Sequence, residues 1–307
     1  MLTTVKRNGL SWNNIQKPTA KDWRFITDTL KIPDDLTVEM MEHLQQPRIE
    51  KNGNNLYFHT NVPLFNRLKQ ITEIGDLHII LTPNNLTTIT FSQNIPVKSI
   101  FHRANKSESF ARNLFSGDSS VLFLKFLLEL FSLSFDKIKH INENIDWVKE
   151  TVFDEYSTGD NVKEISKIKL DILMFQRVLG PQKNILESLS QDFSSFFDTD
   201  EKKLLLHKLI RTNIKVWNNV ESAQRIIESL EITNNSIVSF RLNNTMRFLA
   251  AVSLITFALS VTLGIFSVIP FSSLAIAHYP ETFWLIIFLL ILVSLFSFWI
   301  FYKKRWF

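Results

Sequence analysis

The 307-residue chain contains no cysteine, so disulfide bonds and thiolate metal sites are excluded. It also lacks a P-loop, a dinucleotide-binding fingerprint, a nucleophile elbow and a catalytic-triad spacing, which argues against an enzyme. The formal net charge is only +4, and no basic stripe is interleaved with aromatic residues, so we expect no nucleic-acid partner. The histidines form no HxxxH pair, so the sequence indicates no zinc site in its polar part.

Charged residues are also missing from two long runs near the C-terminus, Phe248–Ile269 and Thr282–Tyr302. Each run has about 20 residues, the length that a helix needs to cross a hydrocarbon core of roughly 30 Å. A buried soluble helix is rarely apolar on every face for so long. The sequence therefore predicts a transmembrane helical hairpin at residues 248–269 and 282–302.

Positive charges flank this hairpin on one side only. Arg241 and Arg247 precede the first run and Lys303–Arg305 follow the second, whereas the loop Pro270–Glu281 has no lysine or arginine. Because positively charged flanks are retained in the cytoplasm, we expect both termini there, in a bacterial inner or plasma membrane. The N-terminus lacks the apolar core of a signal peptide, so we expect the large polar region to stay cytoplasmic as well.

Residues 1–105 are predicted to form an α/β module. Residues 11–46 have a mainly helical pattern, in which Thr19 is an expected helix N-cap with Asp22 in the first turn. A second short helix is predicted at Leu36–Leu44.

Strand patterns follow in the same module. Residues 54–65 alternate, and we expect Pro63 to break that strand. Residues 76–92 contain two β-rich runs around Pro83–Asn85, which indicates a hairpin. Residues 95–104 are predicted to add a further short strand.

From residue 106 onward the pattern is helical. Apolar residues spaced by three and four predict an amphipathic helix over 118–156, and further helices are predicted at 162–179, ending near Gly180-Pro181, and at 183–197. A last helix begins at 198–200 and meets no breaker until Gly264, which predicts a stalk of about 60 residues or ~90 Å. The expected fold is α+β, with a helical and stalk region at 106–240 and a membrane hairpin with a basic tail at 241–307.

This layout resembles the CorA family of divalent-cation transporters and its ZntB relatives over most of the chain. The residues that carry the resemblance are Trp12, Pro18-Thr19 and the runs HIILTPNNLTTITF, VKSIFHR, FQRVLGPQKNILESL and SFRLNNTMRFLAAVSLITFALSVTLGIF. The family typically has an Asn, a Met-Lys pair and a helix that ends Gly-Ile-Tyr-Gly-Met-Asn. Here Asn243, Met246-Arg247 and Gly264–Phe266 match without a gap.

The sequence departs from the family at its signature. Ser267, Val268 and Ile269 stand where the resemblance places Gly-Met-Asn, and the acidic Met-Pro-Glu-Leu loop is missing. In the family that asparagine helps to hold a hydrated cation at the pore mouth. Isoleucine has no oxygen for the water shell of magnesium, an ion that dehydrates reluctantly. This difference leaves the ion open between magnesium, zinc and a similar cation.

The resemblance implies a homopentamer whose first membrane helix lines a pore. It places Asn243, Leu249, Phe257, Ser260, Gly264 and Ile269 toward the axis. Spacing supports one shared face, because the small or polar positions Asn243, Ala250, Ser253, Ser260, Gly264 and Ser267 mostly lie three, four or seven residues apart. Small residues also let membrane helices pack closely without any pore, so helix packing is the alternative.

Three further groups of residues have alternative interpretations. His278 and Glu281 in the outer loop could share a metal between copies, or simply be solvated. Asp34, Asp35, Glu39 and Glu42 could hold a regulatory cation, or Asp34 and Asp35 could start a helix. The stalk cations Lys202, Lys203, Lys208, Arg211, Lys215 and Arg225 could attract anions or lipid headgroups, or form a solvated face.

The sequence thus predicts a CorA-like channel or transporter for a divalent cation such as magnesium or zinc. It requires no resident cofactor, and its partners are copies of itself, the lipid bilayer and the transported ion. Thr212-Asn213 stand where the family commonly has an aspartate that senses magnesium, so we expect a weakened sensor. The alternative is a transport-inactive membrane scaffold or regulator with a sealed pore.

Overall fold

The computed structural model describes residues 2–42, 46–66, 71–91, 96–154 and 158–268, with a few separate positions after residue 268. The chain divides into two compact units, Met1–Glu231 and Ile232–Phe307. The predicted domain boundaries after residues 105 and 240 stay predictions.

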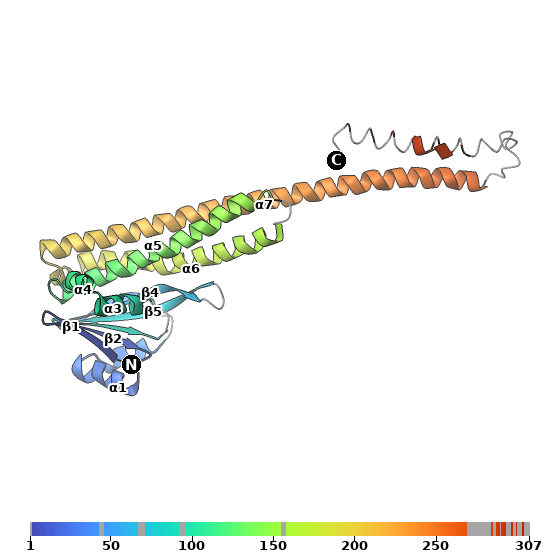
Figure 1. The fold of residues 1–307 in the computed structure, drawn as a ribbon. Helices are drawn as coiled ribbons and strands as arrows, with labels where there is room; N and C mark the ends of the chain where they lie inside the picture. Colours follow the sequence, from blue (N-terminus) through green and yellow to red (C-terminus); the bar gives the residue numbers. More distant parts are fainter. Residues whose placement is uncertain are drawn as a thin grey trace. The chain divides into compact units, whose positions relative to one another are not determined.

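The first unit contains a six-stranded sheet with the strand order β1-β2-β6-β5-β4-β3 (Figure 1). Neighbouring strands are antiparallel except β2 and β6, which are parallel. The strands are β1 Leu2–Arg7, β2 Leu10–Gln16, β3 Arg48–Asn52, β4 Asn55–Asn66, β5 Ile71–Leu81 and β6 Asn85–Thr90. The hairpin predicted around Pro83–Asn85 is confirmed as the β5–β6 pair.

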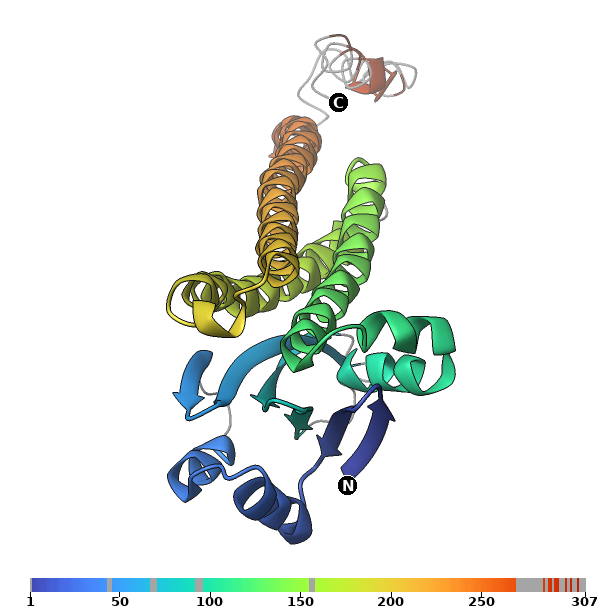
Figure 2. The same ribbon diagram turned by 90° about the vertical axis from the view of Figure 1, so that its left-hand side faces the viewer.

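Helices cover both faces of this sheet (Figure 2). One face packs on the first set, α1 Ala20–Arg24, the π-helical η1 Phe25–Thr29 and α2 Asp34–Met40. The other packs on the second set, α3 Pro96–Lys106, α4 Glu108–Leu114, α5 Ser119–Thr151, α6 Thr158–Gln191 and the short η2 Ser194–Phe196. The last helix, α7, runs from Asp200 to Val268 and belongs to both units. The predicted α+β class with a long stalk helix is confirmed.

A second core lies between the long helices of the first unit. The apolar stripe predicted in residues 118–156 is buried in α5, where Ile138, Ile141, Ile145 and Val148 pack against α6 and α7. Full burial of such a side chain contributes about 1.5–3 kcal/mol. Asp118 is the N-cap of α5, because its carboxylate accepts a hydrogen bond of 3.0 Å from the Val121 N–H. This core fixes the α7 residues from Val216 to Ile227 against the unit.

The starts of the helices α1 and α2 can be compared with their predicted positions. Thr19 precedes α1 as predicted, and its N–H and hydroxyl both donate to the Asp22 carboxylate, at 2.8 Å each. The second helix begins at Asp34, earlier than the predicted Leu36, and ends at Met40. Asp34 and Asp35 lie in its first turn, where carboxylates interact favourably with the helix dipole.

The first two strands were not predicted. Residues 2–16 form a hairpin whose turn is Asn8-Gly9, with φ angles of 50° and 77°. Asn-Gly is the usual pair for a two-residue turn in which both residues have positive φ. The Asn-Gly pair therefore indicated a hairpin, but the helical pattern of residues 11–46 led to a helical prediction for this part of the chain.

Two predictions about the module were wrong. Residues 96–104 do not add a strand, because Pro96–Lys106 form α3, whose buried Val97, Ile100 and Ala104 follow helical spacing; the predicted residue 95 lies outside the described residues. Pro63 does not break its strand either, since β4 continues to Asn66. The pairing of β3 with β4 stops at His59, so Pro63 lies where one side of β4 is an edge and a missing N–H is tolerated.

The predicted helix end at Gly180-Pro181 was also wrong. The helix α6 continues through Pro181 to Gln191. A proline inside a helix costs about 3 kcal/mol. Burial of Val178 and Leu179 before it and of Ile185 and Leu186 after it holds both sides of the helix in place.

The sheet brings together two histidines that are distant in the sequence. His59 and His78 are directly opposite on β4 and β5, fully buried, and their rings stack with centroids 4.5 Å apart. The Tyr57 hydroxyl lies 2.8 Å from Nδ1 of His78, and Asp76 lies 3.4 Å from Nε2 of His59. Burial, followed by the nearby His59, lowers the pKa of His78 to about 3.

We predict that acid destabilises this module. Because the pKa of His78 is lower in the folded protein than in the unfolded chain, its contribution is fully present above pH ~6.5 and is lost as the pH falls toward 3. The loss amounts to roughly 1.4 kcal/mol per pH unit. The thermal midpoint of His78→Gln should fall less between pH 7 and pH 4 than that of the unchanged protein, whereas exposed His140→Gln should behave like the unchanged protein. Identical pH dependence in the His78 variant would contradict this assignment.

Candidate pore face and polar sites

The C-terminal part of α7 carries no charged residue from Phe248 to Val268. Among the described residues, one helix is long and apolar enough to cross a membrane, and it is this one. The second predicted span is described only at scattered positions, and the loop with His278 and Glu281 lies outside the described residues. The predicted Ile269 also lies outside them, and the side chains of Ser267 and Val268 are not described.

The predicted pore-lining residues share one face of α7. Successive residues of an α-helix are about 100° apart around its axis. At this spacing the predicted residues from Asn243 to Gly264 fall within an arc of about 120°. Met246, Ala250 and Ser253 lie on the same arc. We call this arc the open face, and its predicted members are Asn243, Leu249, Phe257, Ser260 and Gly264.

The open face is uncovered in the single chain. Leu249 is 56% exposed and Phe257 is 67% exposed. Asn243 and Ser260 are exposed as well, and a Cβ added at Gly264 would meet no atom within 4 Å. This face is therefore free to meet lipid, water or another copy of the chain.

The opposite face of the same segment is partly covered. Ala251 is buried, and Ile255, Leu259 and Thr262 are half-buried, whereas the residues between them are exposed. These four positions lie on an arc about 180° away from the centre of the open face. We call them the covered face. The side of the helix opposite the serine and glycine positions is thus the less exposed one.

Hydroxyl groups in this segment bond to their own helix. Ser260 donates to the Thr256 carbonyl at 2.8 Å, and Thr262 donates to the Ala258 carbonyl at 2.8 Å. Such bonds to the fourth preceding residue satisfy the donor in apolar surroundings. The oxygen of Ser260 keeps lone pairs that can accept from water or contact a cation.

The stalk position predicted to carry a weakened sensor is occupied by a buried amide network. Asn213 of α7 donates to the Gln182 side chain of α6 at 3.2 Å. Gln182 in turn donates to the Thr60 hydroxyl at 3.2 Å and to the Asn61 carbonyl at 2.8 Å on β4. Because Asn213 is only 2% exposed, it is fixed inside its own chain and does not face an ion between copies.

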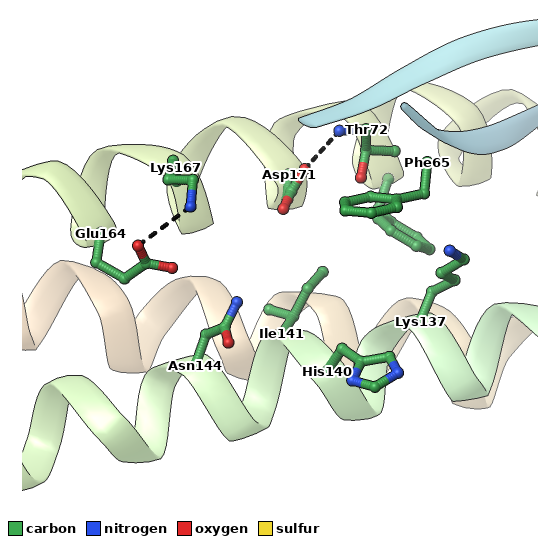
Figure 3. Close-up of a pocket in the computed structure, with 10 residues that line it drawn as sticks. Phe65, Thr72, Lys137, His140, Ile141, Asn144, Glu164, Lys167 and Asp171 are labelled. Atoms are coloured by element: carbon green, nitrogen blue, oxygen red, sulfur yellow. Dashed lines mark hydrogen bonds and ion pairs between the residues drawn. The ribbon is translucent and has the colours of Figure 1, made fainter. Parts of the chain in front are cut away.

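The pocket in Figure 3 lies between α5, α6 and the ends of β4 and β5 and has a volume of about 390 Å³. Asp171 accepts a 2.8 Å hydrogen bond from the Thr72 N–H, and Lys167 pairs with Glu164 at 3.3 Å. The Lys137 ammonium lies 4.6 Å from the Phe65 ring centre. Asp171, Lys167 and Glu164 are thus engaged within the chain, and we assign no ligand to this pocket.

The acidic residues considered for a regulatory cation are not gathered into a site. Glu39 pairs with Arg48, while Asp34 and Asp35 begin α2. Glu42 is exposed. In the described part of the chain, no group of three or more histidine, aspartate or glutamate residues is arranged to hold a metal.

A family model described as "CorA-like Mg2+ transporter protein" matches residues 7–304. The chain belongs to this family. Membership in this family supports divalent-cation transport across a membrane as the activity of this CorA-like chain. It also indicates that the chain is a transporter rather than an enzyme. A comparison with curated proteins gave no match.

Solved structures share the fold of this CorA-like chain. The complete CorA magnesium transporter from Methanocaldococcus jannaschii has 18% identity and a TM-score of 0.80, over 99% of this chain and 94% of that one. The full-length CmaX protein has 17% identity and a TM-score of 0.69, over 97% and 89%. The ZntB cytoplasmic domain from Vibrio parahaemolyticus RIMD 2210633 has 12% identity and a TM-score of 0.54, over 76% and 88%.

Proposed function

We propose that the chain forms a homopentamer in which the open face of α7 lines a pore for a divalent cation. The proposal rests on one observation: the open face and the covered face lie on opposite sides of α7 and carry different kinds of residue. The covered face is apolar except for Thr262, whereas the open face carries Asn243, Ser253, Ser260 and Gly264. One chain leaves this face uncovered, so only additional copies can enclose a path along it.

The ion passes down its electrochemical gradient and no chemical step is involved. The described part of the span holds no charged side chain, so the lining acts through amide, hydroxyl and backbone oxygens and through pore width. Leu249 and Phe257 supply apolar constrictions, which can gate by excluding water. Magnesium and zinc are the cargo that we propose, and the protein needs no resident cofactor.

The membrane placement is part of the same proposal. The helices at 248–269 and 282–302 span a bacterial inner or plasma membrane, and both termini are cytoplasmic. The distribution of Arg241, Arg247 and Lys303–Arg305 supports this orientation.

A second function is favoured by two other features. Phe257 is large and lies on the open face, and Ser267–Ile269 replace the expected Gly-Met-Asn. A ring of such phenylalanines could close the path permanently. The chain would then be a membrane-anchored scaffold or regulator with the same assembly.

Flux through liposomes separates the two functions. With a metal-sensitive dye inside, the unchanged protein should admit magnesium or zinc faster than empty liposomes. Ser260→Leu should reduce the rate about tenfold or more, because it narrows and dries the path. Thr262→Leu is the matched control, because it removes a similarly bonded hydroxyl from the covered face, and it should leave the rate unchanged.

Two results would count against transport along the open face. Flux no faster than empty liposomes for every divalent ion would favour the sealed scaffold. Equal flux in the unchanged protein and in Ser260→Leu would place any path elsewhere.

Native mass spectrometry tests the assembly. In mild detergent the particle should have about five times the 35.8 kDa mass of the chain. A stable monomer would contradict both functions, since neither a shared pore nor a sealed ring exists in one copy.

A further inference from the structure

Basic side chains form a regular ladder on the first turns of α7. Lys203, His207, Arg211 and Lys215 recur at every fourth residue, and Lys208 lies beside them. Residues four apart are neighbours on a helix surface, so these groups lie along one ridge. All five are exposed. The opposite side of the same segment, at Leu206, Leu209, Asn213 and Val216, is buried in the first unit.

The lysines and the arginine of the ladder are not balanced by ion pairs in the described part of the chain. The side chains of Lys203, Lys208, Arg211 and Lys215 make no ion pair within the described residues. No aspartate or glutamate occurs in α7 from Lys202 to Val220.

Several other cations on the long helices are paired. Lys139, Lys149, Lys167, Lys183 and Arg225 each pair with a carboxylate three or four residues away. Lys163 and Arg177 of α6 are exposed and make no ion pair within the described residues, as in the ladder. The ladder differs from them because it gathers several unpaired cations on one short segment of helix.

Like charges at this spacing repel and weaken the helix. A bound anion would remove that repulsion. Arginine presents a planar fork that matches phosphate oxygens, and lysine adds a mobile point charge. The ladder extends over about 18 Å of helix, which exceeds the reach of a single phosphate group.

We propose that this ladder binds a soluble anion with several linked phosphate groups, of the type found in a nucleoside triphosphate or a short polyphosphate. The ladder ends at Lys215, well before the predicted span begins at Phe248, which favours a soluble ligand over a lipid headgroup. This site goes beyond the proposed transport function and does not depend on it.

Calorimetric titration of the full-length protein with inorganic tripolyphosphate tests the site. At about 100 mM salt, which screens isolated surface charges, the unchanged protein should still bind. The variant Lys208→Gln/Arg211→Gln/Lys215→Gln should bind about tenfold more weakly or not at all. The control Lys139→Gln/Lys149→Gln/Lys183→Gln removes the same number of charges from ion-paired positions and should bind as the unchanged protein does. Equal weakening in both variants, or no binding by the unchanged protein, would overturn the proposal.

Two further measurements address a lipid ligand and the stability of the ladder variant. The protein in nanodiscs should bind tripolyphosphate equally with neutral and with anionic lipid, and weaker binding with anionic lipid would assign the ladder to headgroups instead. Without ligand, the ladder variant should unfold at the same temperature as the unchanged protein or at a higher one, because repulsion is removed. A lower midpoint would show that these cations already have partners in the fold.

Discussion

The packing of α7 on its own chain is the constraint on which the rest of the structure depends. In the first unit, Val216, Val220 and Ile227 are locked into the core with α5 and α6. In the second unit, Ala251 is buried and its neighbours on the covered face are half-buried. Each contact fixes the rotation of the helix within its unit. In the second unit most of the segment is exposed, and the open face lies opposite its least exposed residues.

Much of this arrangement follows from sequence patterns that are local. The apolar stripe of α5, the Thr19 cap of α1 and the uninterrupted α7 could be predicted from residue spacing, from capping residues and from the absence of breakers. The Asn8-Gly9 turn was equally readable and was missed. Errors arose where tertiary packing overrides a local signal. Pro181 lies inside α6 because the buried residues on both sides hold the helix together.

Other features depend on contacts between distant segments, so no local pattern predicts them. The stacking of His59 on His78 requires the register of β4 against β5. The Asn213–Gln182 contact requires α7 to lie beside α6 at one particular rotation. The sequence has Asn213 in the region where the family commonly has an aspartate, but the sequence alone could not show that the Asn213 side chain is buried within its own chain. The open face was predicted in part from spacing, whereas the covered face opposite it appears only in the structure.

The central claim is that the open face borders water in the assembled protein, and cysteine accessibility tests it most directly. The chain has no cysteine, so each introduced thiol is the only one present. The assembled protein in liposomes, treated with a small water-soluble thiol reagent, should react quickly as Ser253→Cys and Ser260→Cys. It should react slowly as Ile255→Cys and Leu259→Cys, on the covered face. Fast reaction at 255 and 259 with protection at 253 and 260 would contradict the claim.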